Sequence, residues 1–196
     1  MYHQIMTRKY QQTKRAVAQE ETRQRIVEAA IKLHQSKGPA ATSMRDVAQE
    51  AGVGTVTVYR HFADDMELLG ACSGTYFERH PLPDLAEWAT VEGGEERFRH
   101  GLAAAYAFHR ETEPMISSVI DDLRGSPIMA PYDGYWQAAG EILLAAFPEP
   151  ERQDPLLKAT IALALNFETW RLLACDAGLS DEAAVDLITR LLHDCR

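Results

Sequence analysis

The residues best suited to contact a charged partner lie between Thr42 and Phe62, in the first third of a 196-residue chain. Their side chains carry hydroxyl groups, positive charge or small apolar surface, and few of them are suited to packing in a hydrophobic core. Hydroxyl and methyl groups can meet base edges in a DNA major groove, whereas phenol, guanidinium and imidazole groups can reach phosphate oxygens. The candidates for such contacts are Arg45, Thr55, Val56, Thr57, Tyr59, Arg60 and His61.

Two short helices joined at a glycine would position these side chains. We expect helices over 44–51 and 55–61, because Thr42 or Ser43 can cap the first and Gly52 can adopt the left-handed turn between them. A small residue lets the two helices cross closely, and branched apolar residues fill the wedge between them. The residues expected in that wedge are Val47, Ala48, Val53 and Val58. This is the sequence form of a helix-turn-helix.

Helical periodicity continues through the rest of the chain, with no convincing strand pattern and no internal repeat. The fold class predicted is therefore all-α. Connections rich in Pro and Gly are expected at 81–94, 125–131 and 148–155. The remaining helices are expected at 20–37, 64–80, 95–111, 115–124, 132–147, 156–176 and 181–194.

The net charge conceals a division of the chain. The formal charge of −9 would by itself disfavour a nucleic-acid partner. Residues 1–63, however, hold ten Lys or Arg and five acidic residues, which gives +5 and leaves −14 for the remainder. Opposite charges on two segments indicate two parts with different partners, of which the first can meet phosphates.

The stretch from Arg23 to Leu69 resembles the N-terminal domain of the TetR (tetracycline-repressor-like) family of bacterial transcriptional regulators. The resemblance rests on five matching sequence segments within about a quarter of the chain. They are Arg-Ile-Val-Glu-Ala-Ala at 25–30, Thr42, Asp-Val-Ala at 46–48, Ala-Gly-Val at 51–53 and Thr-Val-Tyr-Arg-His-Phe at 57–62.

The resemblance implies a three-helix DNA-binding domain followed by a helical ligand-binding and dimerisation domain. On this basis we divide the chain into a basic arm (1–19), a helix-turn-helix domain (20–65) and a C-terminal domain (66–196). The family's base-contacting positions fall on Arg45, Thr55 and Val56. Its backbone-contacting positions fall on Ser43, Thr57, Tyr59 and His61. Repression of a palindromic DNA operator by a homodimer, relieved by an unidentified small-molecule effector, is the family's usual mode.

Three positions depart from the family pattern. Gly54 stands where Ser is common, Asp65 where Lys is common, and His34 where Phe usually packs under the first helix. Because Asp65 withdraws a phosphate-binding charge, we hypothesise that the arm before residue 20 lies along the DNA backbone or in the minor groove. We interpret His34 as a core-edge histidine with a partner, with pH sensing as the alternative.

The last two expected helices, 156–176 and 181–194, favour a homodimer. The first is apolar nearly all round between Thr160 and Phe167, as suits a helix packed on its own core and on a second surface. Two such helices from each subunit would form a four-helix bundle around a twofold axis. Packing within one subunit is the alternative.

Aromatic side chains on the middle helices can line an effector pocket, although an aromatic residue at helical spacing also suits an ordinary core. Acidic residues among them would favour a cationic or amine-bearing ligand if they faced inward, and a solvated acidic face is the alternative. The candidate ligand-binding residues are Tyr106, His109, Met115, Asp122, Trp136, Phe167 and Trp170.

The sequence carries no catalytic, metal or cofactor signature: it lacks His-Glu-x-x-His, Gly-x-Ser-x-Gly, a glycine-rich phosphate loop and paired cysteines. We therefore expect no enzyme, no metal and no cofactor. Two other functions remain as alternatives, a small all-α enzyme using His100 and His109, and a helix-turn-helix that binds only protein.

No apolar run suits a bilayer and no signal peptide is evident, so a soluble cytoplasmic protein without a membrane partner is expected. The cysteines are three and far apart, as suits a reduced cytosol. A redox sensor using Cys72 and Cys175 is an alternative to buried structural thiols.

Overall fold

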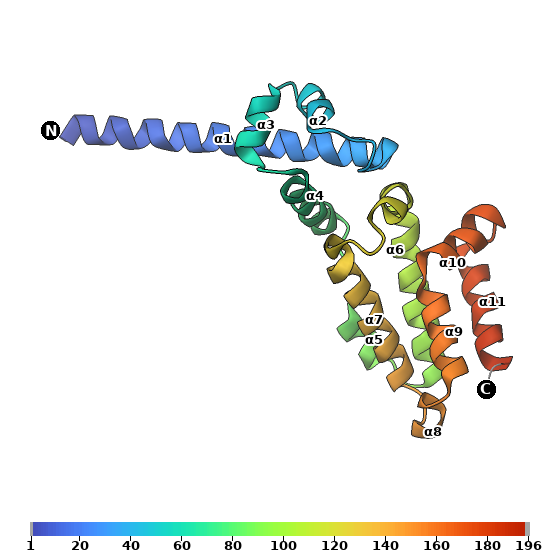
Figure 1. The fold of residues 1–196 in the computed structure, drawn as a ribbon. Helices are drawn as coiled ribbons and strands as arrows, with labels where there is room; N and C mark the ends of the chain where they lie inside the picture. The colour runs from blue at the N-terminus through green and yellow to red at the C-terminus, as the bar shows by residue number, and fades with distance from the viewer. Residues whose placement is uncertain (1, 195–196) are drawn as a thin grey trace. The chain divides into compact units, whose positions relative to one another are not determined.

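The computed structural model describes the backbone of residues 2–194 and the side chains of residues 13–193 (Figure 1). Within these residues the chain forms helices and no strand, which confirms the all-α prediction. The chain divides into two compact units. The first contains the chain up to Arg79 together with Pro114–Arg124, and the second contains His80–Glu113 and everything from Gly125 onward.

The first unit is built from four helices and the end of a fifth. They are α1 (Tyr2–Lys37), α2 (Met44–Glu50), α3 (Thr55–His61), α4 (Asp65–Arg79) and the last turns of α6 (Gly94–Leu123). Helix α1 begins at Tyr2 rather than near residue 20, because residues 2–19 contain no Gly or Pro and are rich in good helix formers. The predicted basic arm is thus a continuation of α1, and the side chains of its first twelve residues lie outside the described ones.

One apolar core joins the elements of the first unit. It includes Ile26 and Val27 of α1, Val58 of α3, and Cys72 of α4. Met115 and Val119 of α6 belong to the same core. Because α4 and the end of α6 share this core, the unit extends beyond the domain boundary expected at residue 65.

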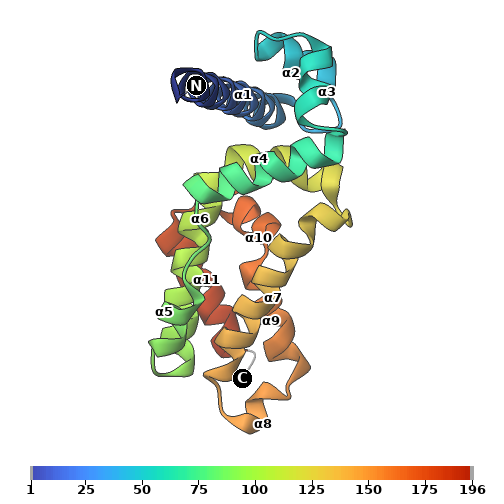
Figure 2. The same ribbon diagram turned by 90° about the vertical axis from the view of Figure 1, so that its left-hand side faces the viewer.

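The second unit contains the start of α6 and all later helices, and Figure 2 shows α7 running beside α9. Two short helices, α5 and α8, lie in segments expected to be connections. Asp84 caps the start of α5, and Pro150 lies in the first turn of α8, where proline is tolerated. The elements besides α6 are α5 (Leu85–Thr90), a 3-10 turn (Pro127–Met129), α7 (Ala130–Ala145), α8 (Glu149–Arg152), α9 (Pro155–Leu165), α10 (Phe167–Arg171), a π turn (Leu172–Asp176) and α11 (Asp181–Asp194).

Helix α6 passes through Pro114, where two helices were predicted. A proline inside a helix removes one backbone hydrogen bond and costs about 3 kcal/mol. Apolar residues on both sides are buried, among them Phe108, Met115 and Ile116, and Pro114 itself is exposed. Burial of each such side chain stabilises the folded state by about 1.5–3 kcal/mol, which together is enough to keep the helix continuous.

The single helix predicted over 156–176 is interrupted at Asn166. The Asn166 side chain accepts a hydrogen bond from the Glu168 N–H (2.8 Å) and so begins α10. The chain then widens into a π turn at Leu172. The prediction was wrong here because composition alone does not reveal a cap inside an apolar run.

Candidate functional site

The turn between α2 and α3 has the geometry that its glycine predicts. Gly52 has φ +66°, and a Cβ built there would meet no atom within 4 Å, so only backbone conformation selects glycine. The Val53 N–H donates to the Ala48 carbonyl (2.9 Å), which holds the turn closed. Ala48 and Val58 are buried where the two helices cross. The helix-turn-helix predicted from spacing is confirmed.

Helix α2 is anchored at its start by a capping box. The Ser43 side chain accepts from the Asp46 N–H (3.2 Å), and the Asp46 carboxylate accepts from the Ser43 N–H (3.0 Å). Lys37 of α1 donates to the same carboxylate (2.9 Å). Hydrogen bonds from Lys37 and then Ser43 lower the pKa of Asp46 to about 2. These bonds fix the first turn of α2, and with it Arg45.

Helix α3 buries one side and presents the other to solvent. Val58 is fully buried, whereas Val56 is 67% exposed and Tyr59 is 53% exposed. Arg60 is also exposed, and Thr55, Thr57 and His61 are half-buried. Val56 and Tyr59 together leave apolar surface exposed beside Arg60 on this seven-residue helix, where a partner could contact it.

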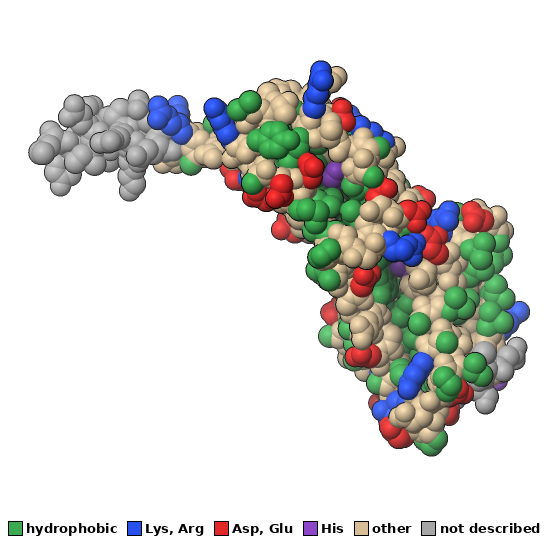
Figure 3. Space-filling model, in the orientation of Figure 1, with side chains coloured by type: hydrophobic (Ala, Val, Ile, Leu, Met, Phe, Trp, Pro, Cys, Tyr) green, Lys and Arg blue, Asp and Glu red, His purple; other side chains and the backbone are tan. Residues whose placement is uncertain are grey.

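The basic residues near this surface differ in whether they are already neutralised. Lys32 pairs with Glu50, and Lys37 with Asp46. Among the described residues, Arg45 and Arg60 form no salt bridge, so their charge is available to phosphates. In Figure 3, Lys and Arg side chains project from the surface over α2 and α3, at the top of the view.

Five of the seven candidate ligand residues come together in the second unit. His109 lies at the centre of an aromatic cluster, with ring centroids 4.8 Å from Trp136, 5.5 Å from Phe167, 5.9 Å from Trp170 and 6.4 Å from Tyr106. His109 and Tyr106 have no exposed surface.

The other two candidates belong to the first unit. Met115 packs in its core, and the Asp122 carboxylate accepts a hydrogen bond from the Ala40 N–H (2.9 Å). They lie apart from the aromatic cluster, because α6 passes from one unit to the other at Pro114.

The His109 ring has a defined tautomer. Its Nε2 lies 3.1 Å from the Leu165 carbonyl oxygen, which accepts only, so Nε2 carries the proton. Nδ1 is then an acceptor, and it is buried without a partner among the described residues, as is the Tyr106 hydroxyl. Burial lowers the pKa of His109 to about 4, so the ring is neutral near pH 7. A buried acceptor without a donor costs free energy, which a suitable ligand would recover.

The acidic residues around the cluster are already engaged. Asp181, which sequence reasoning did not single out, accepts two hydrogen bonds from Arg110 (2.6 and 2.8 Å) and one from the Trp170 indole (2.9 Å). Burial raises the pKa of Asp181, but the bonds from Arg110 and Trp170 outweigh it, and the net shift is downward. The Glu168 carboxylate pairs with Arg171. The cluster therefore favours an uncharged ligand over the cationic one considered from sequence.

A cavity of about 490 Å³ between α7 and α9 reaches the cluster at Trp136. Its size lies within the range of small-molecule sites. Its lining residues are Trp136, Gln137, Gly140, Glu141, Leu144, Lys158, Ile161 and Ala162. Trp136 thus stands between this cavity and the His109 ring.

Exposed leucines mark the last helices of the second unit. Leu163 of α9 is 57% exposed, and Leu187 and Leu191 of α11 are 38% and 46% exposed. Figure 3 shows hydrophobic side chains over the face formed by α9–α11. Ile161 and Leu165 of α9 are buried, so α9 has apolar residues on both its inner and outer sides, as the sequence predicted.

The two described cysteines are in different settings. Cys72 is buried and its thiol lies 3.8 Å from the Val27 carbonyl, while Cys175 is exposed. Burial raises the pKa of Cys72 to about 12 and also raises that of Cys175. Thiolates are the reactive form, so neither environment favours redox sensing. No three His, Cys, Asp or Glu side chains of the described part could together hold a metal ion.

Within the described range, no helix has the length and apolar composition needed to cross a bilayer.

Residues 26–72 match the family described as bacterial regulatory proteins, tetR family. Over 86 residues the chain is 38% identical to the transcriptional regulator SrpR of Pseudomonas putida, covering 40% of this chain and 39% of SrpR. Over 77 residues it is 40% identical to the transcriptional repressor KstR of Mycolicibacterium smegmatis, covering 39% of this chain and 37% of KstR. Among solved structures, the multidrug binding protein EbrR is similar over 87% of this chain and 89% of its own, with 27% identity and a TM-score of 0.55.

The matched stretches thus span less than half the length of SrpR and KstR. SrpR is named as a transcriptional regulator and KstR as a transcriptional repressor. The fold similarity extends over nearly the whole chain, while the sequence match lies in the helix-turn-helix domain. On these grounds residues 26–72 form a DNA-binding domain of the type found in the tetR family of bacterial regulatory proteins.

Proposed function

We propose that the protein is a DNA-binding transcriptional regulator, a repressor that binds a palindromic operator as a homodimer and leaves it when a small-molecule effector binds. The observation that carries the proposal is the outer side of α3, where Val56 and Tyr59 are exposed beside the unpaired Arg60. The name of KstR, a transcriptional repressor, supports repression. A repressor that only occludes its operator needs no contact with RNA polymerase. Because the operator is bacterial DNA, a protein that binds it would work in the cytoplasm.

The DNA contacts follow from exposure and chemistry. Val56 can meet a thymine methyl, the hydroxyls of Thr55 and Thr57 can meet base edges or phosphate, and Arg45 can bind a guanine or a phosphate. The phosphate contacts proposed are Ser43, Tyr59, Arg60 and His61.

The exposed leucines of α9 and α11 support a homodimer through these two helices. One helix-turn-helix covers only about 600–1,000 Å² of protein surface on DNA, which is small for a specific site. Two subunits related by a twofold axis would read half-sites about 34–36 Å apart. Leu163, Leu187 and Leu191 are the side chains that we expect at the seam of this dimer.

The proposed effector site is the aromatic cluster around His109. An effector with a hydroxyl or N–H group on a flat apolar body would donate to His109 Nδ1 and meet the Tyr106 hydroxyl, neither of which has a partner among the described residues. EbrR is a multidrug binding protein complexed with imidazole, which supports a small-molecule ligand here. Release from DNA requires that the effector favour a conformation unsuited to the operator, and such coupling is typically about 1–3 kcal/mol.

Selection of bound DNA from a random pool tests this proposal directly. A palindrome of two half-sites is the expected result, because it requires both DNA binding and twofold symmetry. A compound library is then screened for release of that operator, with Tyr106→Phe and Trp136→Ala as pocket variants. Selection that recovers no sequence, or a single unrepeated half-site, would contradict the proposal.

A further inference from the structure

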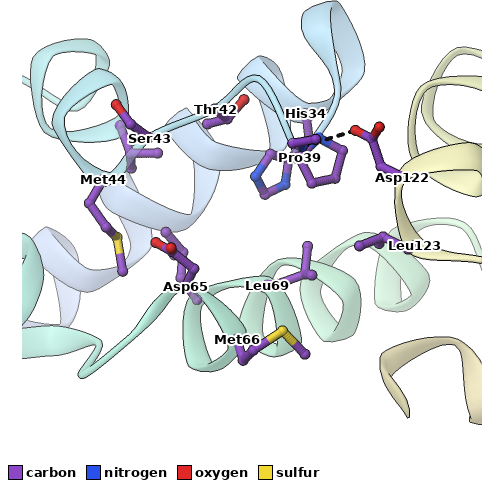
Figure 4. Close-up of a pocket in the computed structure, with 13 residues that line it drawn as sticks. His34, Pro39, Thr42, Ser43, Met44, Asp65, Met66, Leu69, Asp122 and Leu123 are labelled. Carbon is purple, nitrogen blue, oxygen red and sulfur yellow. Dashed lines mark hydrogen bonds between the residues drawn. The ribbon is translucent and has the colours of Figure 1, made fainter. Parts of the chain in front are cut away.

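A second cavity, of about 300 Å³, lies within the first unit and is separate from the aromatic cluster (Figure 4). Its walls come from the end of α1, the start of α2, the start of α4 and the end of α6. Its volume is at the lower end of small-molecule sites, so it would suit a compact ligand.

The most buried polar side chain that lines this cavity is the His34 imidazole. His34 is 6% exposed, and its ring forms no hydrogen bond with any described residue, which corrects the expectation that it has a partner. Figure 4 shows the ring directed into the space between α1 and α4. Burial lowers the pKa of His34, so near pH 7 the ring is neutral and offers one acceptor and one donor nitrogen.

The charged residues that line the cavity are all acidic. Asp65 stands at the start of α4 and Asp122 near the end of α6. Asp122 already accepts from Ala40, while Asp65 forms no salt bridge with a described residue. No Lys or Arg of the described part of the chain lines the cavity. Two carboxylates with no cation opposite them favour a positively charged occupant.

The neutral polar residues are occupied, and the rest of the wall is apolar. The Thr42 hydroxyl donates to the Gly38 carbonyl (2.7 Å), and the Ser43 hydroxyl accepts from Asp46. The apolar lining consists of Val47, Leu68, Leu69, Leu123, Pro39 and the flexible side chains of Met44 and Met66. Methionines adapt to varied ligand shapes, which suits a binding surface.

We propose that this cavity binds a small organic cation, an ammonium or amidinium group carried on a compact apolar body. The cationic N–H groups donate to the Asp65 carboxylate and to the acceptor nitrogen of His34. The apolar body packs against Met44, Leu69 and Leu123. This site is independent of the effector site around His109, because every residue lining it belongs to the first unit.

Occupancy would act on DNA binding directly. Met44 is the first residue of α2, and its neighbour Ser43 lines the same cavity. A ligand held between Met44 and Asp65 fixes the spacing of α2 and α4. This consequence rests on the proposed function, whereas binding of the cation does not.

The test is a titration of the full-length protein with benzylammonium chloride, followed by amide chemical shifts in ¹H–¹⁵N NMR. Benzyl alcohol, which is neutral and nearly isosteric, is the matched ligand control. Saturable shifts clustered on His34, Met44, Asp65 and Leu69 are expected with the cation, at an affinity in the millimolar range usual for so small a ligand. Benzyl alcohol should bind at least about tenfold more weakly.

Three variants complete the test. His34→Phe fills the cavity and should abolish the shifts, and Asp65→Asn should weaken binding about tenfold. Asp121→Asn, beside Asp122 but outside the cavity, should leave binding unchanged. Equal binding of benzyl alcohol, retention of binding by His34→Phe, shifts confined to the second unit, or no saturable shift at all would overturn the proposal. If the NMR result is positive while DNA selection fails, the cation site stands and the proposed function does not.

Discussion

His109 gives the structure a specific dependence of stability on pH. Its ring is fully buried, and its pKa lies at about 4 in the folded chain against an ordinary value of 6.5. The unfolded chain therefore binds a proton at His109 at a pH where the folded chain does not. Because protons then favour unfolding, the contribution of His109 is fully present above pH 6.5 and is lost as the pH falls toward the folded value.

The size of the effect follows from the two pKa values. A difference of about 2.5 pH units corresponds to about 3 kcal/mol once the pH is well below both values. At about pH 5 the loss is already about 2 kcal/mol. His109→Phe keeps an aromatic ring at this position and removes the group that titrates. It also leaves the Leu165 carbonyl without a donor, at about 1–3 kcal/mol, and removes the unpaired Nδ1, which offsets that cost.

Urea unfolding at several pH values measures the effect, at one fixed protein concentration because a dimer's stability depends on concentration. Between about pH 7 and pH 5, the wild-type free energy of unfolding should fall about 2 kcal/mol further than that of His109→Phe. His100→Phe, at an exposed position on the same helix, is the control and should follow the wild type. Parallel pH profiles for wild type and His109→Phe would refute the buried neutral imidazole.

Three other predictions concern DNA reading, assembly and the turn. Arg45→Ala should relax base preference at one position by about 1–3 kcal/mol, whereas Tyr59→Phe should weaken all sites about equally, as measured by binding to a panel of single-base operator variants. Leu163→Glu should convert the proposed dimer to monomer in sedimentation, since it places a charge on the proposed apolar seam. An unchanged sedimentation coefficient would contradict that seam. Gly52→Ala should lower the free energy of unfolding by about 1–2 kcal/mol in thermal unfolding, because φ is +66° although there is space for a Cβ. Gly74→Ala, inside α4 where a Cβ would also meet no atom, should raise the free energy of unfolding by up to about 1 kcal/mol.

Much of the first unit was predictable because its signals are local. The bounds of α3 were predicted as observed, since Gly52 and Gly54 set its start and Phe62 leaves the helix. The burial of Val58 and the exposure of Val56 follow from one helical turn with a single apolar side. The capping box is likewise readable from the sequence, because Ser43 and Asp46 stand three positions apart at the start of the expected helix.

The rest depends on contacts that are distant in sequence. Nothing near Pro114 says that α6 continues, because the burial that holds it together involves residues on both sides of it and on other elements. The unpaired state of His34 depends on what α4 and α6 leave empty around it, although its departure from the family's usual Phe was a signal for the space. The partner of the Leu165 carbonyl at the end of α9 is His109, which is 56 residues earlier.

That bond from His109 to Leu165 couples the interior of the second unit to its surface. Leu165 ends α9, and two residues before it Leu163 is turned outward. The carbonyl that His109 holds is therefore less than one helical turn from a proposed seam residue. An effector that shifts the His109 ring would loosen or rotate the last turn of α9 without any long chain of intermediates. We expect the first measurable consequence of effector binding to be faster amide hydrogen exchange around Asn166, before any change in the helix-turn-helix.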